Sequence, residues 1–110
     1  MSSSFEAQIP DFIRLLELSL RSGYSITQSL EIVGRDMAPP LADDARALHV
    51  QLAGGTPLPE ALAGWLRLRP SHGLDLVAAT VAVQMEIGGN LADKLRLLRQ
   101  IMGKRRLERD

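Results

Sequence analysis

Apolar residues recur with helical spacing on both sides of three glycines, Gly23, Gly55 and Gly88. Each glycine is preceded by apolar residues at offsets −10, −7 and −3 and followed by apolar residues at +3, +7 and +10. These positions are Ile13, Leu16, Leu20, Ile26, Leu30 and Val33; Ala45, Leu48, Leu52, Leu58, Leu62 and Trp65; and Ala78, Val81, Met85, Leu91, Leu95 and Leu98. Steps of three and four residues place side chains on one helical face. Each glycine is therefore predicted to lie in the turn between two amphipathic helices.

The repeated pattern predicts an all-α fold, an antiparallel bundle of about six helices built from three helix-turn-helix hairpins. The predicted helices span residues 9–22, 26–36, 40–53, 58–69, 73–87 and 91–108. Residues 1–8 are expected to form a flexible start, and residues 9–110 a single domain. Common ancestry of the three hairpins stays open, because amphipathic hairpins produce such offsets by geometry alone.

Residues around the glycines agree with turns between helices. Gly23, Gly55 and Gly88 suit positions just past a helix end, where the left-handed backbone region is needed. Ser25 is predicted to cap the second helix, with Gln28 completing a capping box. In the same way Asn90 with Asp93 is predicted to cap the sixth helix. Thr56 is the candidate cap in the middle copy, where Pro57 and Pro59 occupy the first turn.

The fifth predicted helix differs from the others in its composition. Only four polar residues interrupt the stretch "GLDLVAATVAVQMEIG". Apolar side chains therefore surround most of its circumference, and we predict that it is the central, buried helix of the bundle. The helix is short and carries polar residues, which argues against a membrane span.

Composition narrows the possible chemistry. The chain has no cysteine, which excludes disulfides and thiolate metal sites. Four aromatic residues leave most of the core to Leu, Val, Ile and Ala. The net charge of zero conceals a basic C-terminal segment that includes Lys104, Arg105 and Arg106.

Glu86 is the most informative candidate for chemistry. It precedes Gly88 and Gly89, which lack the Gly-Lys-Ser/Thr sequence of a phosphate-binding loop. Glu86 shares a helical face with Asp75, but the two residues lie about 16 Å apart along the axis, whereas paired acid/base carboxylates lie within about 10 Å. Two interpretations stay open: Glu86 binds backbone N–H groups or an arginine near the turn, or it binds a partner.

Other titratable residues carry no catalytic or metal-binding pattern. His49 and His72 have no ligand or nucleophile at a characteristic spacing. Asp43 and Asp44 suit the first turn of a helix, where negative charge is stabilising. We therefore predict no catalytic residue, no cofactor and no metal site.

The basic segment "KRRLERD" has three interpretations. It is either a solvated helix end, a nucleic-acid contact, or a cytoplasmic segment next to a membrane helix. The zero net charge and the absence of interleaved aromatic residues argue against nucleic acid.

Three motifs in this order resemble the F domain of type II secretion and type IV pilus platform proteins, and most closely its tight-adherence (Tad or Flp) branch. They are "LRSGYSITQSLEIV", "GGTPLPEALAGW" and "QMEIGGNLADKL", within a similarity that covers residues 12–109. The residues that match the family motif are Gln84, Glu86, Gly88, Gly89, Asn90 and Leu91, together with Gly23, Gly55 and Leu62.

The resemblance implies a cytoplasmic, non-catalytic scaffold domain joined to helices of the bacterial inner membrane. Its implied partners are a hexameric assembly ATPase, pilin subunits and other platform subunits in a homo- or hetero-oligomer. Lys104, Arg105 and Arg106 would then lie next to the membrane, and the native protein is expected to continue beyond both ends of this chain. Two alternatives stay open: a free-standing helical-repeat adaptor, and a small helical hydrolase that uses Glu86 with Asp75 or a histidine.

Overall fold

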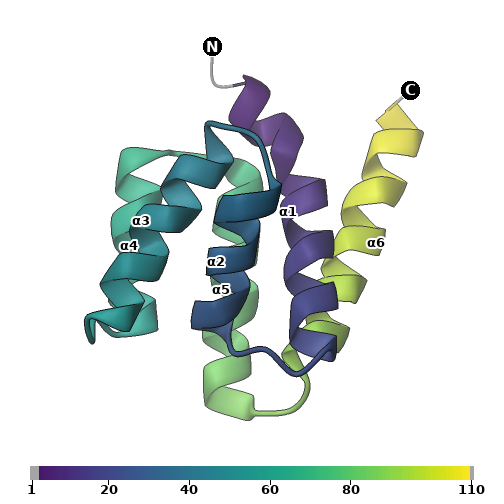
Figure 1. Ribbon diagram of the computed structural model, residues 1–110. Coiled ribbons are helices and arrows are strands. Elements are labelled where there is room, and N and C mark those ends of the chain that lie inside the picture. The colour runs from purple at the N-terminus through teal and green to yellow at the C-terminus, as the bar shows by residue number, and fades with distance from the viewer. Residues whose placement is uncertain (1–2, 110) are drawn as a thin grey trace.

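The computed structural model describes the backbone of residues 3–109 and the side chains of residues 4–104. The described chain forms six helices and no strand, so the all-α prediction is confirmed (Figure 1). The helices are α1 (Ser3–Arg21), α2 (Ile26–Asp36), α3 (Leu41–Ala53), α4 (Leu58–Leu68), α5 (His72–Ile87) and α6 (Leu91–Arg109). Five of them begin and end within about one residue of the predicted bounds.

The first helix begins at Ser3, six residues before the predicted start at residue 9. Phe5 is buried and belongs to the core, and its ring contacts the ring of Trp65 with centroids 6.0 Å apart. Burial of this side chain explains why the helix continues N-terminal to Pro10. The prediction of a flexible start over residues 1–8 is therefore wrong for residues 3–8.

The helices alternate in direction, so the turns gather at two ends of the bundle (Figure 1). The turns that contain Gly23, Gly55 and Gly88 lie at one end, and the connections near residues 38 and 70 lie at the other. The C-terminal end of α6 also lies at the end opposite the glycine turns. The three glycines have φ angles of 98°, 104° and 84°, which L-residues with a Cβ rarely adopt.

The most extensive helix packing joins different hairpins: α2 packs on α3, and α1 packs on α6. Helix α1 contacts α2, α3, α5 and α6, and its residues Ile9, Phe12 and Ile13 are almost fully buried. The central helix is therefore α1. The prediction of a buried central α5 is wrong, because Val83, Met85 and Ile87 are exposed at its C-terminal end.

Three of the four aromatic residues form one cluster in the core. Trp65 contacts Phe5 and Phe12 in edge-to-face geometry, with centroid distances of 6.0 and 5.6 Å. The indole Nε1–H of Trp65 donates to Asp44 Oδ2 at 3.0 Å, and Arg69 Nε donates to the same oxygen at 2.7 Å. Asp44 thus satisfies the polar edge of a buried ring, which is a structural role.

Two of the three predicted helix caps are present, at Ser25 and Asn90. The third is absent, and one further cap was not predicted. Ser25 and Gln28 form the predicted reciprocal capping box. Thr56 is not the cap of α4, since the N-cap position is Pro57 and has no side-chain cap. The N-terminus of α5 has a cap that sequence analysis missed. Ser71 Oγ accepts from Leu74 N–H and donates to Glu6, whose other oxygen accepts from Gly73 N–H at 2.9 Å.

Candidate functional site

The turn between α5 and α6 holds most of the family motif. Gly88 N–H donates to the carbonyl oxygen of Gln84 at 2.8 Å and ends α5. Gly88 and Gly89 both have positive φ, 84° and 99°. The side-chain oxygen of Asn90 accepts from Asp93 N–H at 3.0 Å and begins α6, which confirms the predicted cap. These residues are explained by turn geometry.

Gln84 fastens this turn through its side-chain amide. Its Nε2 donates to the carbonyl oxygen of Gly89, and its Oε1 accepts from Lys94 Nζ at 2.9 Å. Lys94 Nζ also donates to the carbonyl oxygen of Gly88 at 2.9 Å. Sequence analysis did not single out Lys94, because only the folded turn brings its ammonium to this carbonyl. Gln84 and Lys94 together hold the last turn of α5 against the first turn of α6.

Glu86 stands apart from this network. Its side chain is exposed and makes no hydrogen bond or ion pair with any residue that the structure describes. Met85 and Ile87 on either side of it are also exposed. Among the described residues, Glu86 therefore binds neither a backbone N–H group nor an arginine. The side chain presents a negative charge among apolar groups at the surface.

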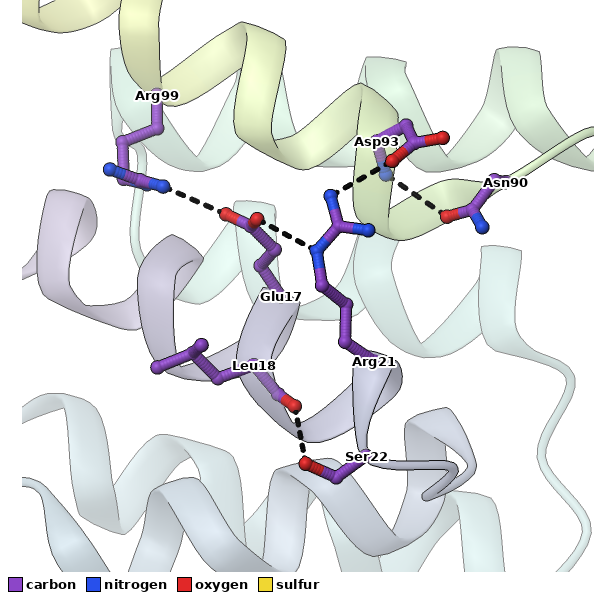
Figure 2. A network of polar contacts seen from close by, with 7 residues as sticks. All are labelled: Glu17, Leu18, Arg21, Ser22, Asn90, Asp93 and Arg99. Carbon is purple, nitrogen blue, oxygen red and sulfur yellow. Dashed lines mark hydrogen bonds and ion pairs between the residues drawn. The ribbon is translucent and has the colours of Figure 1, made fainter.

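A second carboxylate, Glu17 on α1, has the opposite environment (Figure 2). It is 5% exposed and accepts from Arg21 Nε at 3.1 Å and from Arg99 Nη2 at 2.9 Å. Arg21 also donates to Asp93 at 2.8 Å, so the network joins α1 to α6. Sequence analysis missed this network, because residues 17 and 99 are 82 positions apart. The only sign of this network in the sequence was the acidic residue Glu17 on the apolar face of the first helix.

Opposing effects set the pKa of Glu17. Burial alone would raise this pKa, because it removes water from the charged form. Hydrogen bonds and positive charge from Arg99 and Arg21 outweigh burial and place the pKa of Glu17 below its ordinary value. Glu17 is thus ionised at neutral pH and serves as an internal counter-ion.

The remaining sequence candidates have local structural surroundings. His49 Nδ1 lies 2.8 Å from the carbonyl oxygen of Thr27, and His72 is exposed at the start of α5. Leu91 is half-buried and packs against the core. Lys104 is exposed, whereas the side chains of Arg105 and Arg106 lie outside the described residues.

Two of the cavities that open on the surface of the described residues contain neither Glu86, Asp75 nor a histidine. One of about 330 Å³ lies between α3 and α4 and is lined mainly by apolar groups around Leu48 and Trp65. The other, of about 520 Å³, lies between the α1 and α6 ends and includes Arg21 and Asn90. The described residues include no group of three His, Asp or Glu side chains placed to hold a metal ion. The arrangement gives the hydrolase interpretation no support.

The described part of the chain is an all-helical domain whose glycine turns, helix caps and α1–α6 ion pairs have structural roles. A sequence profile described as "Type II secretion system (T2SS), protein F" matches residues 12–110. The chain therefore belongs to this family, whose members are inner-membrane platform proteins with a structural rather than a catalytic domain. No curated protein and no solved structure gives a significant match. Among the described residues, no helix has both the length and the apolar character that crossing a bilayer requires.

Proposed function

We propose that this chain is the cytoplasmic interaction domain of an inner-membrane platform protein for pilus assembly or type II secretion. In this role it couples a hexameric assembly ATPase to the handling of pilin subunits, and it contacts other platform subunits. Membership of the protein F family carries the proposal. The motif "QMEIGGNL" further favours the tight-adherence pilus branch of that family.

The division of the motif into structural and free residues supports a partner contact at Glu86. Gln84, Gly88, Gly89 and Asn90 all have roles within the turn. Glu86 has no such role among the described residues. A charged side chain in water can be replaced at little cost to the fold, so the fold itself does not require glutamate at this position. A partner outside the chain gives Glu86 a role that the turn does not.

The direction of α6 supports a membrane-proximal position for the basic segment. The C-terminal end of α6, where Lys104, Arg105 and Arg106 lie, is remote from the glycine turns (Figure 1). Lysine and arginine accumulate on the cytoplasmic side of membrane helices. We place this end next to the inner membrane and the glycine-turn end farther into the cytoplasm, about 28 Å away along α6.

The direct test uses the membrane-embedded full protein, captured with its cognate ATPase, together with an assay of pilus assembly or secretion. Glu86→Ala and the combined reversal of Lys104, Arg105 and Arg106 to Glu should each reduce assembly without loss of protein. Glu60→Ala, which removes another exposed carboxylate, should leave assembly unchanged. Normal assembly by both test variants would contradict the proposed contacts.

The reading frame after residue 110 distinguishes a platform protein from a free-standing adaptor. A platform protein continues from the basic segment into an apolar membrane helix, whereas a free-standing adaptor ends or repeats the hairpin. An apolar stretch of about 20 residues after residue 110 would support the platform assignment.

A further inference from the structure

Two connections between helices, α2–α3 and α4–α5, lie at the end of the bundle opposite the glycine turns (Figure 1). Both connections expose apolar groups. Leu68, the last residue of α4, is 82% exposed, more than any other large apolar side chain that the structure describes. Pro70 is exposed in the α4–α5 connection, and Ala38 and Pro39 are the exposed residues of the α2–α3 connection. We call these four residues the apolar end.

Two polar side chains of α1 hold both connections in place. The Glu6 carboxylate accepts from Gly73 N–H at 2.9 Å, just past the α4–α5 connection. Gln8 Nε2 donates to the carbonyl oxygen of Ala38 at 2.7 Å, and Gln8 Oε1 accepts from Leu41 N–H at 3.1 Å. The apolar end is therefore fixed to the central helix of the domain.

Several backbone groups of these connections already have a partner or have no N–H to satisfy. Arg69 N–H donates to the carbonyl oxygen of Trp65 at 2.8 Å. Gln8 satisfies a backbone group of Ala38 and one of Leu41. Three residues of the connections have no N–H group: Pro39, Pro40 and Pro70. Because an unpaired backbone group that leaves water costs free energy, these features lower the cost of moving the apolar end out of water.

The charge at this end of the bundle is positive on balance. Arg67 and Lys104 are exposed and have no ion-pair partner among the described residues. The sequence after Gly103 contains four basic and two acidic residues. Asp75, in the first turn of α5, is an exposed acidic residue that offsets one of these charges. Three other acidic residues at this end are paired with arginines: Asp36 with Arg35, Asp43 with Arg46 and Asp44 with Arg69.

We propose that this end of the bundle binds the surface of a bilayer that contains anionic lipids. Leu68 and the prolines lie at the boundary between headgroups and acyl chains. Arg67 and Lys104 reach the lipid phosphates, since long basic side chains extend their charged groups toward the headgroups. The inference rests on the proposed function, which places the end of α6 next to the inner membrane, and it adds a second contact at the end of α4. A domain held at both helices has a fixed tilt on the membrane as well as a fixed distance from it.

The contact is weak on its own, because it combines few apolar groups with few charges. Each basic residue near an anionic membrane strengthens binding about fivefold. In the full protein, a membrane helix after α6 would hold the domain at an effective concentration in the millimolar range. Binding of the isolated chain should therefore be measured at about 1–5 mM lipid.

A fluorescent label reports which end of the bundle meets the lipid. The chain contains no cysteine, so Leu68→Cys and Ile87→Cys each provide a single site for an environment-sensitive fluorophore. Ile87 is 75% exposed and lies next to the glycine turn at the other end of the bundle. With vesicles of phosphatidylcholine and about one-third phosphatidylglycerol, the emission at residue 68 should rise and shift to the blue, and the emission at residue 87 should not change. Vesicles of phosphatidylcholine alone should change neither label.

Unlabelled variants test the two kinds of contact by flotation with the same anionic vesicles. Arg67→Glu and Leu68→Gln should each weaken binding about fivefold or more. Arg96→Glu and Ile87→Gln make the same changes at exposed positions on α6 and α5 and are the matched controls. All four side chains are exposed, so the circular dichroism spectrum and Tm should stay unchanged.

Three results would overturn the proposal. The first is a label at residue 68 that does not respond to anionic vesicles, and the second is a response at residue 87 in its place. The third is unchanged binding by both Arg67→Glu and Leu68→Gln, which would assign lipid binding to the basic segment after Gly103 alone. The vesicles contain no ATPase, pilin or platform subunit, so failure of this experiment is distinct from failure of the assembly assay.

Discussion

The buried carboxylate of Glu17 gives the sharpest prediction about stability. Glu17→Gln keeps the shape of the side chain but removes the charge that faces Arg21 and Arg99. A hydrogen bond to a charged group contributes about 1.5–3 kcal/mol when it is buried. Both arginine side chains are about one-third exposed, and water therefore screens part of each interaction. We expect a loss of about 2 kcal/mol in the free energy of unfolding, or about 10 °C in Tm.

The effect should depend on pH in a defined direction. The pKa of Glu17 is lower in the folded chain than in the unfolded chain. Its ionised form therefore stabilises the fold above the unfolded pKa of about 4.3, and this contribution is lost as the pH falls through the folded pKa. The unmodified chain should thus exceed Glu17→Gln in stability at pH 7, and the difference should shrink steadily below pH of about 4.

Urea denaturation followed by circular dichroism at pH 7 and at pH 3 measures both effects. Glu60→Gln, an exposed carboxylate on α4 with no ion pair among the described residues, is the matched control and should change little. A double-mutant cycle with Arg99→Met should show that the two changes together cost less than their sum. A difference that is the same at both pH values would refute the charge-based reasoning.

Three further changes test the packing and the turns, each by thermal or urea denaturation of the 110-residue chain. Gly73→Ala should cost about 1–3 kcal/mol, because its Cβ would lie 2.5 Å from the Glu6 carboxylate that caps α5. Gly88→Ala meets no neighbouring atom but has a φ of 84°, so only the backbone is strained and the cost should be about 1–2 kcal/mol. Trp65→Phe should cost about 2 kcal/mol, mostly because Asp44 loses the indole N–H, and a neutral result would contradict that role.

The sequence predicted the helices well because their cause is local. Apolar periodicity and turn glycines act over a few residues, and five helices match the predicted bounds closely. The start of α1 was wrong because it depends on Phe5 reaching Trp65, 60 positions away in the chain. The Glu17–Arg99 pair was missed for the same reason. Contacts between distant residues leave no periodic signal.

The error about α5 has a different physical origin. An apolar surface around most of a helix indicates that other groups will pack against it. It does not indicate whether those groups belong to the same chain or to a partner. The prediction assumed that the other five helices surround α5. In the structure α1 occupies the centre, and Val83, Met85 and Ile87 stay exposed. The core takes Leu74, Val77 and Val81 of α5, and the proposed partner contact accounts for the apolar residues left exposed at its C-terminal end.

A comparison of equivalent positions in the hairpins strengthens that explanation. The residue two positions before the turn glycine is Arg21 in the first hairpin and Glu86 in the third. In the first hairpin this position faces α6, where Arg21 pairs with Asp93. In the third hairpin no helix of the described chain covers the equivalent position. The charge of Glu86 therefore has no counterpart among the described residues, which agrees with the proposed contact to a partner.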